Sequence, residues 1–185
     1  KSLVVFDMPY KSYENKFLAY KNAKKVLQTT KCDAVKLEGG KKIIKIVKYL
    51  TKKGIPVMGH VGLLPQTAKN YSIKGKDSYE KKQILEDAVK LSSSGVFAIV
   101  IECVVESLAK KITNLVNVPT IGIGASKYCD GQILVTDDII GLSNFRPKFV
   151  KKYFNIKKFI EKSVKSYCKD VKSKKFPTLL NVYEN

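Results

Sequence analysis

The sequence is poor in the residues that usually build metal clusters, disulfide frameworks and nucleic-acid contacts. Its 185 residues include four cysteines, a single histidine and a single arginine. Because Cys32, Cys103, Cys129 and Cys168 form no C-x-x-C pair, neither a zinc cluster nor a disulfide framework is expected. We expect reduced thiols and a cytoplasmic location. No apolar run is long enough to cross a bilayer, so no membrane partner is expected either.

Positive charge is abundant, but it is carried almost entirely by lysine. The formal net charge is +19, and 34 of the 35 basic residues are lysines, the exception being Arg146. Forked contacts to phosphates and base edges favour arginine, whose guanidinium is planar and bidentate. The lysines are also spread along the chain, and Ile, Asn and Tyr are plentiful, as in proteins from AT-rich genomes. We interpret the lysines as solvated surface residues and expect no nucleic-acid partner; a basic nucleic-acid-binding module is the alternative.

Short apolar runs alternate with longer amphipathic stretches along the chain. The pattern predicts strands at 3–6, 34–37, 55–58, 96–101, 119–122 and 132–135, and helices at about 14–29, 41–53, 78–94 and 106–115. Lys-rich helical segments follow from about 147, with a helical tail over about 157–185. Strands that alternate with helices at this spacing are typical of a parallel sheet with crossover connections. Six strands would suit an open doubly wound sheet, whereas a closed barrel needs eight.

Ionisable side chains stand at the ends of four successive predicted strands. Asp7 follows the first, Lys36 and Glu38 belong to the second, His60 follows the third and Glu102 follows the fourth. Barrels build their active sites at the C-terminal ends of the strands, whereas open sheets use one switch point. Four such ends in a row favour a barrel, because only closure points them all at one centre. We therefore expect a single α/β domain over residues 1–185, of the (β/α)8 TIM-barrel type, with about six of the eight βα units.

Each of these residues also has a structural interpretation. Asp7 precedes a proline-containing turn, Glu38 precedes two glycines at a helix start, and His60 would suit a core position with satisfied hydrogen bonds. Lys36 alternates with apolar neighbours, so it should point inward, where it needs an anionic partner. Glu102 ends six apolar residues, a setting that suits a general base or acid.

Two further patterns concern ligands. Two carboxylates without a histidine cluster suggest a hard metal ion such as Mg²⁺. The glycines at 122 and 124 would let a ligand approach the backbone, or would serve tight packing between strand and loop. They do not form a dinucleotide fingerprint, because the third glycine is missing at the required spacing.

Eight short motifs occur in a fixed order along the chain. They are DMP (7–9), VKLEGG (35–40), PVMGHVGL (56–63), IECV (101–104), LAKKIT (108–113), IGIGA (121–125), DGQILV (130–135) and PKFV (147–150). Together they resemble the ketopantoate hydroxymethyltransferase (3-methyl-2-oxobutanoate hydroxymethyltransferase) family, from the first residues to about Phe154.

The resemblance implies a β/α-barrel enzyme that uses 5,10-methylenetetrahydrofolate to hydroxymethylate 3-methyl-2-oxobutanoate. The product is 2-dehydropantoate, for pantothenate and coenzyme A synthesis. The resemblance also implies Mg²⁺, a cytoplasmic location and a homo-oligomer, typically a homodecamer. Motif by motif, Asp7 resembles a metal ligand that also meets the substrate, and Glu38 resembles a second metal ligand. Lys36 resembles the contact for the substrate carboxylate, Glu102 resembles the proton acceptor, and His60 lies beside the substrate.

The sequence departs from the family pattern in three places. The family has an Asp-Ser pair for metal and substrate in the barrel segment ahead of the first motif, and this chain has no equivalent. We therefore expect the chain to be truncated at its N-terminus relative to the family. The loop over 70–75 looks shorter than in the family, and Val105 stands where the family often has proline. The alternatives are an inactive or degenerate fragment of this enzyme, or a related Mg²⁺-dependent barrel lyase acting on 2-oxo acids.

Overall fold

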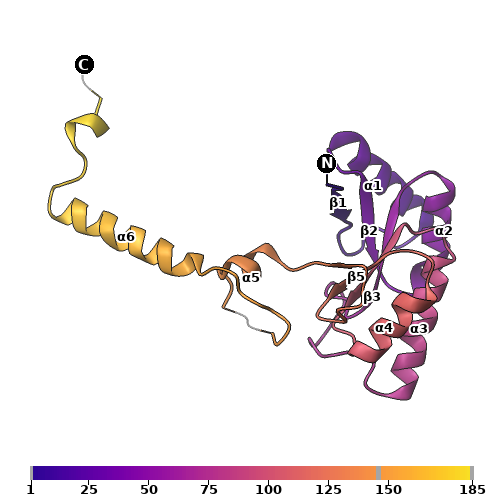
Figure 1. The fold of residues 1–185 in the computed structure, drawn as a ribbon. Helices are drawn as coiled ribbons and strands as arrows, with labels where there is room; N and C mark the ends of the chain where they lie inside the picture. Colours follow the sequence, from indigo (N-terminus) through magenta and orange to yellow (C-terminus); the bar gives the residue numbers. More distant parts are fainter. Residues whose placement is uncertain (1, 145–146, 184–185) are drawn as a thin grey trace. The chain divides into compact units, whose positions relative to one another are not determined.

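The computed structural model describes residues 2–144 and 147–183. The chain divides into two compact units, Lys1–Ile133 and Leu134–Asn185. The first unit contains all the strands found in the described residues, together with helices α1–α4 (Figure 1). Its strands form one parallel sheet in the order β1-β2-β3-β4-β5-β6. Strand and helix alternate along the chain, so the expected α/β, TIM-barrel-type arrangement of six successive strands is confirmed.

The observed elements lie close to the predicted ones. The first unit runs β1 (Val5–Asp7), α1 (Lys16–Thr29), β2 (Ala34–Glu38), the 3-10 turn η1 (Lys41–Ile43), α2 (Ile44–Lys52), β3 (Val57–Gly62), α3 (Ser78–Ser92), β4 (Ala98–Glu102), α4 (Glu106–Leu115), β5 (Thr120–Ile123) and β6 (Gly131–Gln132).

Two expectations need correction. The third strand continues two residues beyond His60, because β3 pairs with β4 as far as Gly62. The last strand is shorter than expected, because the segment after Ile133 belongs to the second unit.

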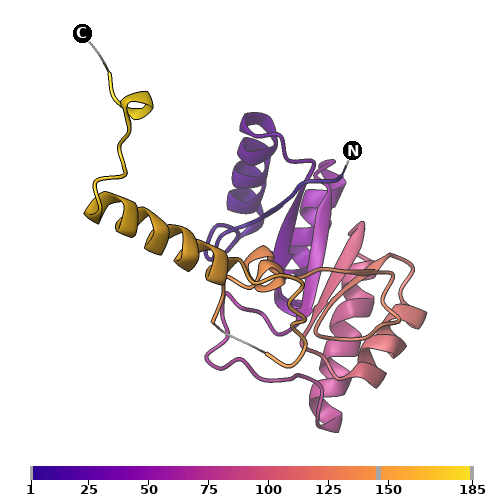
Figure 2. The same cartoon turned by 60° about the vertical axis from the view of Figure 1, so that its left-hand side comes forward.

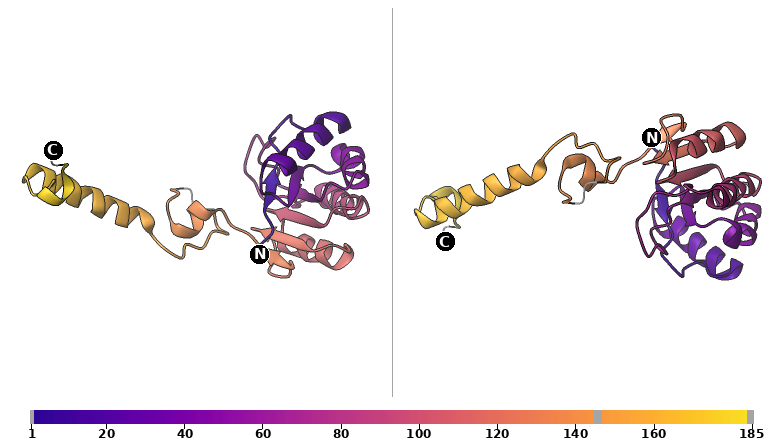
Figure 3. Two further views of the ribbon diagram at one scale, coloured as in Figure 1. Left: turned by 90° about the horizontal axis from the view of Figure 1, so that it is seen from above. Right: turned by 90° about the horizontal axis from the view of Figure 1, so that it is seen from below.

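One face of the sheet is covered by helices. α3 packs against β3 and β4 and lies beside α4, and α1 packs on α2 (Figure 2). Seen from above, the strands lie along the inside of a curve and α1–α4 lie outside it (Figure 3). Val35, Leu37, Val57, Ile99 and Ile101 are buried in the hydrophobic core of this unit. These apolar positions alternate along β2, β3 and β4, because successive side chains of a strand point to opposite faces.

The other face of the sheet carries the ionisable residues. Asp7 of β1 is paired in register with Lys36 of β2, and Glu38 is paired with His60 of β3. Paired residues in neighbouring parallel strands share a face. Glu102 of β4 is paired with Gly62, which lies two residues beyond His60 and therefore on the same face. Strand alternation and register thus bring all five predicted site residues to one side of the sheet.

The second unit is helical in its described residues. It contains α5 (Thr136–Ile140), α6 (Ile156–Lys172) and the 3-10 turn η2 (Leu179–Asn181). The side chain of Asn155 caps α6 by accepting a hydrogen bond from the Lys158 N–H. The predicted tail begins within a residue of α6; its positions 184 and 185 lie outside the described residues. Across the described part of the chain, no helix is both long and apolar enough to cross a membrane. The assignment of residues 1–185 to one domain stays a prediction.

Candidate active site

Lys36 stands at the centre of the candidate site. Its Nζ lies 2.8 Å from Asp7 Oδ2, 3.6 Å from Glu38 Oε1 and 3.3 Å from His60 Nδ1. The Lys36 side chain is only 16% exposed, so its charge is largely withdrawn from water. A lysine in that position requires nearby anions. The apolar neighbours of Lys36 in the sequence predict that it points inward and needs an anionic partner. The two carboxylates supply that partner.

Glu38 is a buried carboxylate surrounded by donors. Its side chain is 4% exposed, and Oε2 accepts the Gln66 backbone N–H at 3.1 Å. Its other oxygen faces Lys36 and lies 3.7 Å from His60 Nδ1. The start of the following helix is served by another carboxylate, because the Lys41 N–H donates to Asp87 Oδ1 at 2.9 Å. Glu38 therefore faces the site, and the interpretation of Glu38 as a helix-terminal carboxylate is not supported.

His60 joins the two halves of the site. The imidazole is only 2% exposed; Nδ1 faces Lys36 and Nε2 lies 3.3 Å from Glu102 Oε2. The Lys36 ammonium can only donate, so its contact with Nδ1 is a hydrogen bond when Nδ1 is the acceptor nitrogen of the ring. Among the described residues Nε2 has no aligned hydrogen-bond partner, so the short approach to Glu102 is a contact without hydrogen-bond geometry. The alternative interpretation of His60, as a core histidine with both ring nitrogens hydrogen-bonded, is therefore not supported.

Glu102 ends β4, and its side chain is 15% exposed. Its backbone carbonyl accepts the Leu63 N–H at 2.8 Å, which holds the ends of β3 and β4 together. Gly62 makes this approach possible: a Cβ there would lie 2.3 Å from the Glu102 carbonyl oxygen. The Glu102 carboxylate therefore has a fixed backbone, a histidine beside it and access to solvent.

One residue of the site is not predicted by the sequence patterns. Gln66, in the loop after β3, donates from its side-chain amide to the Met8 carbonyl at 2.9 Å and to Asp7 Oδ1 at 3.5 Å. Its Oε1 accepts the Tyr13 hydroxyl at 2.9 Å. Loop residues have no hydrophobic periodicity, so nothing in the pattern marks Gln66 except its place after a strand that ends in the site.

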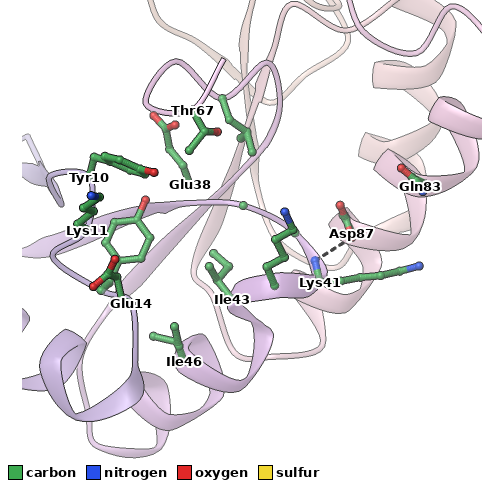
Figure 4. Close-up of a pocket in the computed structure, with 15 residues that line it drawn as sticks. Tyr10, Lys11, Glu14, Glu38, Lys41, Ile43, Ile46, Thr67, Gln83 and Asp87 are labelled. Carbon is green, nitrogen blue, oxygen red and sulfur yellow. Dashed lines mark hydrogen bonds between the residues drawn. The ribbon is translucent and has the colours of Figure 1, made fainter. Parts of the chain in front are cut away.

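A cavity of about 540 Å³ lies beside Glu38 (Figure 4). Its walls come from the loops that follow β1, β2 and β3 and from one side of α3. They are formed by Tyr10, Lys11, Tyr13, Glu14, Glu38, Gly39, Gly40, Lys41, Lys42, Ile43, Ile46, Leu64, Thr67, Gln83 and Asp87. Burial is the main cause that raises the pKa of Tyr13 above 10.0. The volume is in the range of small-molecule sites, and Tyr13 and Glu38 link the cavity to the charged cluster.

The loop before α3 is attached to the end of β4. The Lys74 N–H donates to the Cys103 carbonyl at 2.7 Å, and the Val105 N–H donates to the Lys74 carbonyl at 3.0 Å. Glu80 accepts the Gly75 N–H. This places the end of the 70–75 loop, which looks short for the family, directly beside the strand that carries Glu102.

Gly122 has a packing role. A Cβ at this position would lie 2.9 Å from the Gln132 side-chain amide and 3.1 Å from Cys129 Sγ. For Gly122 the structure favours tight strand–loop packing over ligand approach.

The two carboxylates beside Lys36 suit a hard cation. Within residues 2–144 and 147–183 no three His, Cys, Asp or Glu side chains converge to hold a metal ion. Mg²⁺, however, is usually bound by one or two protein carboxylates, with waters and substrate oxygens completing its shell. Asp7 and Glu38 each keep one oxygen turned away from Lys36, and Asp7 is about half exposed (51%). This donor set fits the protein's share of a Mg²⁺ site.

Comparison with known protein sequences identifies a family. Residues 1–179 match the family described as ketopantoate hydroxymethyltransferase. The 3-methyl-2-oxobutanoate hydroxymethyltransferase of Pelagibacter ubique (strain HTCC1062) is 57% identical over 183 residues, which cover 99% of this chain and 71% of that protein. The protein of the same name from Rhizobium etli is 52% identical over 182 residues, 96% of this chain and 67% of its own length. The one from Bartonella quintana is 46% identical over 188 residues, 100% of this chain and 68% of its own length. The chain therefore belongs to the ketopantoate hydroxymethyltransferase family.

Proposed function

We propose that this protein transfers a hydroxymethyl group from 5,10-methylenetetrahydrofolate to 3-methyl-2-oxobutanoate. The products are 2-dehydropantoate, an intermediate of pantothenate and coenzyme A synthesis, and tetrahydrofolate; one water is consumed. Family membership supports the proposal. The observation that carries it is the contact chain from Asp7 and Glu38 through Lys36 and His60 to Glu102. These contacting side chains combine a cation that can bind a carboxylate substrate with a carboxylate that can take a proton.

Lys36 is the proposed contact for the carboxylate of the oxo acid. Its ammonium already lies between two carboxylates on the open face of the sheet. Asp7, the more exposed of these, is the partner that a substrate carboxylate would compete with. His60 lies beside the same ammonium and is therefore proposed to border the bound substrate.

Glu102 is the proposed base. The reaction breaks the C3–H bond of the oxo acid; the proton goes to Glu102, and the electron pair of that bond forms an enolate. The enolate carbon then forms the new carbon–carbon bond to the one-carbon unit, whose two C–N bonds to the folate break. One water supplies the hydroxyl oxygen and the two protons taken up by the folate nitrogens, and the proton held by Glu102 passes to the product oxygen. Positioned carboxylates are effective in such proton transfers when they lie at hydrogen-bonding distance from the reacting C–H group. The backbone contacts of β3 and β4 hold Glu102 in place for this step.

Asp7 and Glu38 are the proposed ligands of Mg²⁺. When bound, the ion would polarise the 2-oxo group and so favour loss of the C3 proton. In the ion's absence Lys36 neutralises the same two carboxylates, and Gln66 donates to both.

We also propose that the protein is cytoplasmic and forms a homo-oligomer, with the homodecamer as the expected state. The four cysteines are free in the structure, which agrees with a reducing compartment. Light scattering of the purified protein would test the oligomeric state.

Product analysis tests the proposed function. The purified protein should convert 3-methyl-2-oxobutanoate to 2-dehydropantoate only when both methylenetetrahydrofolate and Mg²⁺ are present, as followed by mass spectrometry. Folate-independent carbon–carbon cleavage, or no conversion at all, would contradict the proposal.

A further inference from the structure

We infer that Gln66 is a positioning residue that holds Asp7 and Glu38 in the arrangement needed for cation and substrate binding. The inference rests on the proposed function of these two carboxylates. Gln66 belongs to the loop after β3, whereas Asp7 and Glu38 end β1 and β2. One residue of the third connection therefore contacts the ends of the two preceding strands.

The contacts of Gln66 divide between its backbone and its side chain. The backbone N–H donates to Glu38 Oε2 at 3.1 Å. The side-chain Nε2 donates to the Met8 carbonyl at 2.9 Å and lies 3.5 Å from Asp7 Oδ1. Met8 directly follows Asp7 and is itself buried. The Gln66 side chain thus contacts both the backbone and the carboxylate at the end of β1. The Gln66 backbone contacts the carboxylate at the end of β2.

The surrounding groups determine which way the amide points. Nε2 faces two acceptors, and Oε1 accepts the hydroxyl of Tyr13 at 2.9 Å. A reversed amide would place its oxygen against the Met8 carbonyl and a carboxylate, so only one orientation satisfies both ends. The donor end of Gln66 is therefore held toward Asp7 by Tyr13 on the opposite side.

The side chain is not needed to form the loop that carries it. The turn around Gln66 is closed by backbone hydrogen bonds from the Thr67 and Ala68 N–H groups to the Leu64 carbonyl, at 3.1 and 2.9 Å. The amide hydrogen bond to the Met8 carbonyl ties this loop to the backbone that follows β1. What the amide adds is a fixed orientation of Asp7, with Oδ1 toward Gln66 and Oδ2 toward Lys36.

Gln66→Met tests the inference, because it keeps the length of the side chain and the backbone N–H but removes the amide. Mn²⁺ binding, measured by electron paramagnetic resonance, reports on the carboxylate pair independently of turnover. Loss of a group that orients metal ligands typically weakens binding by about 10–100-fold, and we expect a rise of that size in the Mn²⁺ Kd. Added Mg²⁺ should restore much of the lost activity, because the defect lies in cation binding. Gln28→Met, on the exposed side of α1, is the matched control and should change neither quantity.

The outcomes separate the inference from the proposed function. An unchanged Mn²⁺ Kd in Gln66→Met, with saturable binding by the unaltered protein, overturns the inference alone. The same result follows if Gln28→Met weakens binding equally. Absence of saturable Mn²⁺ binding by the unaltered protein overturns the cation role of Asp7 and Glu38, and the inference with it. Should Gln66→Met not fold, Tyr13→Phe removes a single oxygen at the far end of the same network. It should raise the Kd in the same direction but by less, and an unchanged Kd there counts against the inference.

Discussion

Lys36 links the acidic residues of the candidate site. Its ammonium contacts Asp7 and Glu38, which come from neighbouring strands and would repel each other without a cation between them. Breaking a fully buried ion pair costs several kcal/mol, but here Asp7 is half exposed and its charge is partly solvated. We therefore expect a moderate contribution of Lys36 to stability and, on the proposed function, a larger one to the binding of an anionic substrate.

Replacement of this lysine should separate those two roles. In Lys36→Met, the KM for 3-methyl-2-oxobutanoate should rise by about 10–100-fold, the usual loss for a hydrogen bond to a charged group. The free energy of unfolding should fall by about 1–3 kcal/mol in urea titrations, because Glu38 loses its cation. Lys48→Met, on the exposed face of α2, is the matched control. A KM equal to that of the control would remove Lys36 from the substrate site.

The five predicted site residues follow from local rules. Each stands at or near a strand end, and strand alternation and register place them on one face. Gln66 and Asp87 do not follow from such rules, because their importance comes from contacts with residues far away in the sequence. Sequence periodicity therefore identifies the charged cluster, but not Gln66, which contacts two of its carboxylates, or Asp87, which accepts the Lys41 N–H.

At the scale of elements, the connection from β2 to α2 depends on Asp87 of α3. Its Oδ1 accepts the Lys41 N–H, and a Cβ at Gly40 would lie 1.8 Å from its Oδ2. Gly40 thus leaves room for the carboxylate at the start of the helix. Figure 4 shows the hydrogen bond between Lys41 and Asp87 as a dashed line. Burial is the largest cause that raises the pKa of Asp87 above its ordinary value of 3.8.

This raised pKa predicts a pH dependence of stability. The folded protein holds the Asp87 proton more tightly than the unfolded chain, so this contribution is fully present below pH 3.8 and is lost as pH rises through the folded pKa. Asp87→Asn keeps an acceptor for the Lys41 N–H but does not titrate. The unfolding free energy of the variant minus that of the unaltered protein should therefore increase between about pH 3 and about pH 7. A difference that is flat or falls with pH would show that burial of the charge does not control this connection.

The contact between β3 and β4 depends on Gly62. Its φ is +94°, and an added Cβ would meet the Glu102 carbonyl oxygen at 2.3 Å and Val104 Cγ2 at 2.5 Å. Gly54 has a similar φ of +75° but open space around it. Gly54→Ala should cost about 1–2 kcal/mol from backbone strain alone.

Gly62→Ala should cost more than Gly54→Ala, by about 1–3 kcal/mol, because overpacking adds to the strain. Urea denaturation of the two variants gives the comparison. Since Glu102 belongs to the displaced strand, activity should also fall in Gly62→Ala and remain in Gly54→Ala. Equal destabilisation of the two variants would mean that the strand ends can move apart freely.

The order and type of elements along the chain are predictable because each strand is a short apolar run and each helix is amphipathic. The helix over Glu106–Leu115 is predicted to the residue, and the strands of the first unit shift by only a few positions at their ends. The last strand is predicted over 132–135, but its pairing with β5 ends at Gln132. The short helix Thr136–Ile140 is not predicted. The loop contacts of Gln66 and Lys74 depend equally on tertiary structure.

The second unit illustrates the same limit. The lysine-rich, amphipathic pattern predicts a helix, and α6 is found. Its apolar residues Phe159, Ile160, Val164 and Tyr167 are exposed within the described structure. The spacing of apolar residues in the sequence predicts an apolar face on this helix, but it does not identify a partner for that face.

In the proposed mechanism Glu102 removes the C3 proton of a 2-oxo acid bound at Lys36 and at a cation held by Asp7 and Glu38. Deuterium exchange at C3 of 3-methyl-2-oxobutanoate in D₂O, followed by NMR without folate, tests this step alone. The unaltered protein should catalyse Mg²⁺-dependent exchange. Glu102→Gln should lower the rate by about 10²–10⁴-fold, the usual contribution of a general base, while substrate binding stays largely intact. Exchange that is absent from the unaltered protein, or that continues undiminished in Glu102→Gln, would contradict the proposed role of Glu102 as the base.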